Sequence, residues 1–119
     1  MDRERLMADA KAMVLERVRE GYRAPGPRTA IPVGGEEARA ALELGIHLAW
    51  RGGAISDHDA RIGRALARIM TGGDLPHATT VSEQVLLDLE REAFLSLCGE
   101  AKTLDRIRHT LKTGKTLRN

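Results

Sequence analysis

Aromatic residues are scarce in this chain of 119 residues, at only 3% of the composition. Because hydrophobic residues still make up 42%, a core must be built from aliphatic side chains and methionine. The same scarcity argues against a stacking platform for single-stranded bases, which depends on aromatic rings. The length predicts one compact domain.

Cysteine pairs, long apolar runs and an excess of one charge are also missing. The single cysteine, Cys98, excludes an internal disulfide and is typical of a reducing cytoplasm. No apolar run is long enough for a membrane span, and the charged residues 1–4 do not predict a secretory signal. Lys and Arg number 19 against 17 Asp and Glu, so charge alone does not predict nucleic-acid binding. We therefore expect a cytoplasmic protein with no membrane partner.

Apolar residues at spacings of three and four predict five helices and no strand, and therefore an all-α fold. Residues 1–21 are expected to form a lone N-terminal helix with one apolar stripe: Leu6, Ala10, Met13, Val14 and Val18. Residues 22–35 hold three of the four prolines and predict an extended Pro/Gly-rich connector. Residues 36–119 are expected to form a compact four-helix block. Its most apolar helix, ending at Gly99, is expected to be central.

Capping residues set the expected starts of three helices. Ser56 with Asp59, and Thr80 with Glu83, resemble capping boxes, in which two side chains and two backbone amides satisfy each other. Thr103 is the expected N-cap of the last helix.

The sequence TGKT near the end of the chain matches the last part of a phosphate-binding loop. The full motif needs a glycine five residues before Gly114, and His109 stands there. Only residues 117–119 follow, too few for the helix whose N-terminus would hold phosphate. We therefore expect Gly114 to close a helix, with a short tail after it.

No group of residues predicts a catalytic or metal centre. The histidines lack ligand spacing: His47, His58, His77 and His109. The run at 57–59 predicts helix capping rather than metal binding. Cys98 is expected to be a buried, unreactive thiol. Neither a dinucleotide fingerprint nor a nucleophile elbow is present. We expect no catalytic residue, no metal ligand and no bound cofactor in this chain.

Two groups of positive charge remain. Arg61, Arg64 and Arg68 share one face of a predicted helix, and with the preceding helix and turn they could imitate a DNA-binding helix-turn-helix. A solvated helix face is the simpler interpretation. The second group is Lys102, Arg106, Arg108, Lys112, Lys115 and Arg118. It either stabilises a helix C-terminus or binds an anion such as a phosphate.

Three stretches carry a resemblance to a known family. They are LLDLEREAFLSLCGEAKTLDRIRHTLKTGKTLRN (86–119), DRERLMADAKAMVLERVREGYRAP (2–25) and GGAISDHDARIGRALARIMTGGDLP (52–76). Together they resemble the C-terminal region of the bacterial bifunctional 3-hydroxyacyl-CoA dehydrogenase/enoyl-CoA hydratase proteins of fatty-acid β-oxidation.

The resemblance implies a non-catalytic helical domain of a longer enzyme. Its partner would be the remainder of that parent, above all the hydratase portion, or a second copy bound through the N-terminal helix. NAD and acyl-CoA would belong to the parent, and no catalytic residue carries over. If the C-terminal basic group has a ligand role in that parent, Arg108, Lys112 and Lys115 are the residues that would contact the phosphates of coenzyme A; the alternative is stabilisation of the helix C-terminus.

Overall fold

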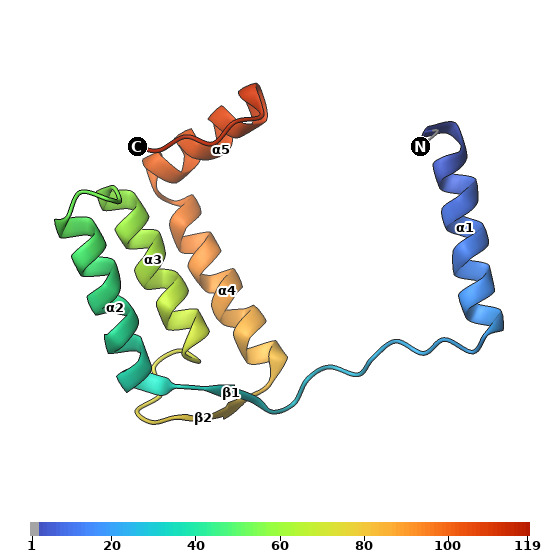
Figure 1. Ribbon diagram of the computed structural model, residues 1–119, viewed down its shortest axis with the longest axis horizontal. Helices are drawn as coiled ribbons and strands as arrows, with labels where there is room; N and C mark the ends of the chain where they lie inside the picture. The colour runs from blue at the N-terminus through green and yellow to red at the C-terminus, as the bar shows by residue number, and fades with distance from the viewer. Residues whose placement is uncertain (1–2) are drawn as a thin grey trace.

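The computed structural model describes residues 3–119, and over that range it contains five helices and two short strands (Figure 1). The helices are α1 (Arg3–Arg19), α2 (Gly35–Arg51), α3 (Asp57–Met70), α4 (Glu83–Cys98) and α5 (Ala101–Thr113). The strands are β1 (Ile31–Val33) and β2 (Thr79–Val81). The predicted all-α class with five helices is confirmed. In the described part of the chain, no helix is long and apolar enough to cross a membrane.

α1 stands apart from the other helices, at the far end of an extended connector (Figure 1). It ends where Gly21 adopts a φ of +78°, which glycine tolerates because it has no Cβ. The amides of Gly21 and Tyr22 donate to the carbonyl oxygens of Val18 and Arg17, at 3.1 and 2.9 Å, as in a Schellman cap. The large apolar side chains of α1 are 44–78% exposed, so this helix buries none of its stripe.

The expectation of no strand was wrong at one place. β1 and β2 pair in antiparallel fashion, with Ile31 opposite Val81 and Val33 opposite Thr79. β1 lies inside the segment predicted to be a connector, and Pro32 is in its middle. Three residues are too few to show an alternating pattern, and the partner strand lies far along the sequence. The short ladder ties the entry to α2 to the entry to α4.

α2, α3 and α4 run side by side, with α3 in the middle (Figure 1). The expectation that α4 is central was therefore wrong. α3 supplies the buried small residues Ala60 and Ala67, which are 1% and 3% exposed. No residue of α4 is buried, and its Phe94 and Leu95 are 58% and 64% exposed. The apolar character of α4 thus belongs largely to its surface.

The capping box predicted at the start of α3 is confirmed. The amide of Asp59 donates to the Ser56 hydroxyl at 3.1 Å, and the amide of Ser56 donates to the Asp59 carboxylate at 3.0 Å. The other two predicted starts were wrong. α4 begins after Ser82, because Thr80 belongs to β2. α5 begins after Glu100, so Thr103 lies inside the helix.

Gly35, the first residue of α2, is a position that only glycine fits. Its φ is +64°, and a Cβ there would lie 2.6 Å from the backbone carbonyl of His77. We expect Gly35→Ala to lower the free energy of unfolding by about 2 kcal/mol or more, because strain and a backbone clash add. Urea denaturation measures this.

Gly45→Ala is the matched control for Gly35→Ala. Gly45 lies in the exposed middle of α2, and a Cβ there would meet nothing within 4 Å. This change should raise the free energy of unfolding by about 1 kcal/mol, because alanine is the better helix former. Equal effects of the two substitutions would contradict the assignment of strain to Gly35.

Candidate functional site

The three residues predicted to contact coenzyme A lie on α5 and just after it, and all are exposed. Arg108 forms one ion pair with Asp105, at 3.5 Å, and its side chain is 73% exposed. Lys112 lies in the last turn of α5, and Lys115 follows Gly114. Gly114 has a left-handed φ of +68° and closes the helix, so the interpretation of TGKT as a helix end is confirmed. Phosphate binding by these residues stays a prediction.

Arg106, from the same basic group, has a structural role instead. Its guanidinium lies 2.8 Å from the Asp59 carboxylate at the start of α3 and donates to the Asn119 side chain at 2.8 Å. The side-chain amide of Asn119 in turn donates to the backbone carbonyl of Lys102 at 3.2 Å. Arg106 therefore joins α5 and the last residues to the N-terminus of α3.

Asp59 is held in its charged form by this arrangement. Its pKa is lowered from 3.8 to about 2, first by the hydrogen bond from the Ser56 amide and then by the hydrogen bond from Arg106. Hydrogen bonds to a carboxylate favour its ionised form. The capping residue predicted from sequence is thus also an anchor for α5, which the sequence pattern did not indicate.

His58 forms a second polar connection between α3 and α5. It is only 3% exposed, and its Nε2 lies 2.9 Å from the Thr103 hydroxyl. Its Nδ1 lies 3.6 Å from the carboxylate of Glu100, which also pairs with Arg61. Thr103, expected to cap α5, therefore holds His58 instead. Both ring nitrogens face polar partners, which is what a buried imidazole requires.

The remaining candidate side chains take ordinary positions. Asp57 accepts a hydrogen bond from the Trp50 indole at 2.6 Å. Cys98 is only partly buried, so the expectation of a fully buried thiol was wrong. Residues 3–119 hold no group of three or more His, Cys, Asp or Glu side chains that could bind a metal ion.

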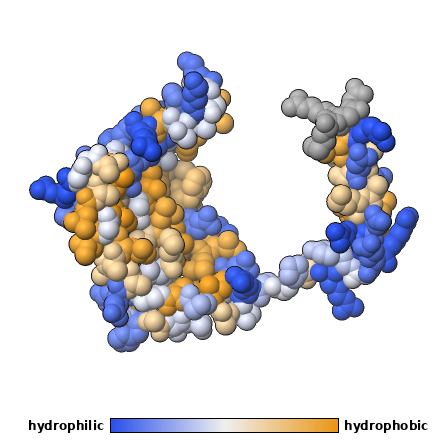
Figure 2. All heavy atoms as spheres, in the orientation of Figure 1, coloured by the Kyte–Doolittle hydropathy of each residue, from blue (hydrophilic) through white to orange (hydrophobic). Residues whose placement is uncertain are grey.

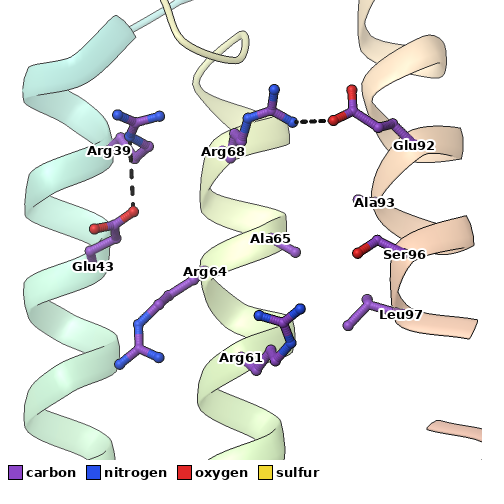
Figure 3. A pocket seen from close by; sticks show the side chains of 10 residues that line it. All are labelled: Arg39, Glu43, Arg61, Arg64, Ala65, Arg68, Glu92, Ala93, Ser96 and Leu97. Carbon is purple, nitrogen blue, oxygen red and sulfur yellow. Dashed lines mark hydrogen bonds and ion pairs between the residues drawn. The ribbon is translucent and has the colours of Figure 1, made fainter. Parts of the chain in front are cut away.

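The arginines of α3 line a pocket of about 330 Å³ between α2, α3 and α4 (Figure 3). The sequence correctly placed Arg61, Arg64 and Arg68 on one face. The full lining, which we call the arginine pocket, is Arg39, Glu43, Arg61, Arg64, Ala65, Arg68, Glu92, Ala93, Ser96 and Leu97. Arg39, Glu43 and Glu92 come from neighbouring helices, and no sequence signal marks them.

Acidic partners fix two guanidiniums of this pocket. Asp74, in the loop after α3, lies 2.6 Å from Arg39 and 2.9 Å from Arg68. Arg68 and then Arg39 lower the pKa of Asp74, and the hydrogen bond with Asp74 raises the pKa of Arg68. Glu92 adds a second contact to Arg68, at 3.3 Å. These two arginines are therefore committed to the fold.

Arg61 and Arg64 are less committed. Arg61 pairs through its Nε with Glu100, and its side chain is 57% exposed. Arg64 is exposed and forms no ion pair or hydrogen bond with any residue of the described range 3–119. Figure 3 shows its guanidinium directed from α3 toward α2. The guanidinium N–H groups of the arginine pocket that have no acidic partner within residues 3–119 therefore belong mainly to Arg61 and Arg64.

The arrangement of α2 and α3 differs from a helix-turn-helix. Such motifs place their helices at about 90–120°, whereas α2 and α3 lie side by side in opposite directions (Figure 1). α3 is also flanked by α2 and α4, which limits its access to a DNA groove. The geometry does not favour the DNA-binding alternative.

The other side of α3 and α4 carries an apolar groove of about 450 Å³. Leu66 and Phe94 are 52% and 58% exposed there. Its lining, which we call the α3–α4 groove, is Ala65, Leu66, Ile69, Leu87, Glu90, Arg91, Ala93, Phe94 and Leu97. Figure 2 shows apolar residues gathered over the block of helices. Exposed apolar patches of this kind mark binding surfaces.

The described residues place this chain, by class, among mostly helical modules with exposed apolar surfaces. The chain is 43% identical, over all 119 residues, to the C-terminal 15% of a probable 3-hydroxyacyl-CoA dehydrogenase of Bacillus subtilis (strain 168). It therefore spans about 15% of the length of this relative. The relative's name agrees with the dehydrogenase part of the resemblance and does not mention a hydratase.

No protein-family model matches the chain. No solved structure matches it either.

Removal of the Asp59 carboxylate should weaken the attachment of α5. We expect Asp59→Ala to lower the free energy of unfolding by about 1–2 kcal/mol at neutral pH, because it removes hydrogen bonds to Ser56 and Arg106. The control is Asp105→Ala, which removes only the exposed ion pair with Arg108. It should change the free energy of unfolding by less than about 0.5 kcal/mol.

The effect of Asp59 should also depend on pH. Because its pKa falls from 3.8 to about 2 on folding, its stabilising effect is fully present above pH 3.8 and is lost as the pH falls toward 2. Thermal unfolding of the unchanged chain and of Asp59→Ala should therefore converge at the acid end. A constant difference across that interval would contradict the assignment.

Proposed function

We propose that this chain is the C-terminal helical domain of a 3-hydroxyacyl-CoA dehydrogenase of fatty-acid β-oxidation, without catalytic residues of its own. The observation that carries the proposal is the 43% identity over the whole chain to the end of such a protein. NAD and the acyl-CoA substrate would be bound by the rest of the parent enzyme, and the enzyme would act in the cytoplasm.

The partner surfaces of this domain are the exposed stripe of α1 and the outer side of α2. Met7 and Val14 on α1 are 78% and 61% exposed, and Leu48 on α2 is 61% exposed. Because the chain spans about 15% of its relative, we propose that the preceding part of the parent covers these surfaces. The more specific proposal, from the family resemblance, is an enoyl-CoA hydratase portion.

Self-association through α1 is the alternative occupant of the stripe. Sedimentation of the isolated chain distinguishes the two. A dimer that Val14→Asp disrupts, and that Ala12→Asp on the opposite side of α1 leaves intact, would support self-association. A monomer at high concentration would leave the parent enzyme as the partner.

Activity measurements test the parentage directly. We expect the full-length parent to oxidise NADH with acetoacetyl-CoA, and the isolated chain to show neither this activity nor hydration of crotonyl-CoA above background. A parent with no dehydrogenase activity would refute the proposed function. Activity in the isolated chain would refute its non-catalytic character.

The C-terminal basic group supplies a further test in the parent. If Lys112 and Lys115 contact a phosphate of coenzyme A, each contact contributes about 1.5–3 kcal/mol. Lys112→Ala with Lys115→Ala should then raise the Michaelis constant for crotonyl-CoA about tenfold or more, without loss of helicity. The double control Arg51→Ala with Arg91→Ala should leave it unchanged. An unaltered constant in both would assign the lysines to stabilisation of the α5 C-terminus.

A further inference from the structure

The α3–α4 groove is apolar except for two adjacent residues of opposite charge. Its apolar lining includes Leu87 and Phe94, which are 46% and 58% exposed. The charged residues are Glu90 and Arg91, both on α4 and both exposed. Arg91 pairs with Asp88 of its own helix through one terminal nitrogen, at 3.1 Å, and Glu90 forms no ion pair within the described part of the chain. The groove therefore offers an unpartnered acid beside a base with spare N–H donors.

The residues that α4 contributes to the groove form a pattern that is symmetric about the midpoint between Glu90 and Arg91. An apolar residue, Leu87 or Phe94, stands at each end, and the two opposite charges stand in the middle. All four residues line the same groove. Two copies of such a helix can lie antiparallel with their midpoints aligned. Because the rise per residue is constant, Leu87 is then level with Phe94 of the second copy, and Glu90 is level with Arg91 of the second copy.

We propose that the α3–α4 groove binds α4 of a second copy of this chain, in a dimer with two-fold symmetry. A closed two-fold interface uses the same patch on both copies, so the patch must be complementary to itself. The groove meets this requirement, because each Glu90 faces an Arg91 and each apolar end faces the other apolar end. Leu66 and Ile69 of α3 line the other wall of the groove. The two copies of α3 and α4 therefore enclose the contact together.

Phe94 and the charged pair have different tasks in this interface. Phe94 is the only phenylalanine of the chain, and aromatic side chains at the centre of an interface carry much of its binding energy. The charges set the direction of packing, because a parallel arrangement would place Glu90 against Glu90 of the second copy, and like charges are repelled. The contact uses neither α1 nor α2. It therefore goes beyond the proposed attachment to a dehydrogenase and leaves those surfaces to the parent.

Sedimentation of the chain over a wide range of concentrations tests the charged part of the interface. We expect an equilibrium between monomer and dimer. Glu90→Arg and Arg91→Glu each place like charges at both pairs, so each should raise the dissociation constant of the dimer about tenfold or more. An equimolar mixture of the two variants should recover the dimer, because every acid again faces a base. Arg51→Glu, the control on α2, should dimerise as the unchanged chain does.

Truncation of an exposed side chain tests the apolar part. Phe94→Ala should weaken the dimer about hundredfold or more, because it removes an anchor from both copies. Leu44→Ala, at a residue of α2 that is 59% exposed, should have little effect, and Val14→Asp on α1 should leave the dimer intact. A monomer at every concentration, a mixture no more dimeric than its two components, or a dimer that Val14→Asp disrupts and Phe94→Ala does not would overturn the proposal. These results do not depend on the activity of the parent enzyme.

Discussion

A row of small residues along α3 allows the three-helix arrangement to form. Ala60, Gly63 and Ala67 lie at spacings of three and four, and so share one face of the helix. Gly63 has no side chain, and a Cβ there would lie 3.2 Å from the Ile46 side chain of α2. α2 can therefore pack closely against α3, and that contact places Arg39 near Asp74 and Arg68. A larger residue in this row would separate the helices that form the arginine pocket.

Polar contacts, rather than a buried apolar core, attach the remaining parts of the block. α5 has no buried residue, and it is joined to α3 through Arg106 with Asp59 and through Thr103 with His58. A hydrogen bond between neutral groups adds about 0.5–1.5 kcal/mol, and one between charged groups about 1.5–3 kcal/mol. α5 lacks the further stabilisation of about 1.5–3 kcal/mol that each fully buried large aliphatic side chain would add. α5 should accordingly open more easily than the pair of α2 and α3.

A small core and abundant exposed apolar surface occur together in this chain. Within the described residues, only Val33, Ala60 and Ala67 are buried apolar residues, whereas large apolar side chains on every helix are exposed. Exposed apolar patches of this kind mark interaction surfaces, and the chain spans about 15% of the length of its relative.

The sequence by itself determined the helices, because their apolar period and end signals are local. The Ser56–Asp59 capping box and the Gly114 cap were predicted correctly because each involves neighbours within one turn. Likeness to the end of a dehydrogenase was also readable from the residues alone. Tertiary structure decided what depends on distant partners. It paired β1 with β2, and because Thr80 belongs to β2, the N-cap of α4 is Ser82 and not Thr80 as predicted.

Tertiary structure also decided the location of the candidate site. The sequence placed Arg61, Arg64 and Arg68 on one face, but it could not show which of them an acidic partner holds. Asp74 and Glu92 are brought to Arg68 only by the loop after α3 and by the approach of α4. The number of apolar residues in a helix also could not identify the middle helix. That number shows how much of the helix surface avoids water, but not which neighbouring helix packs against that surface. The physical reason is the same in each case: a local pattern fixes an element and its faces, whereas contacts between distant residues fix what each face meets.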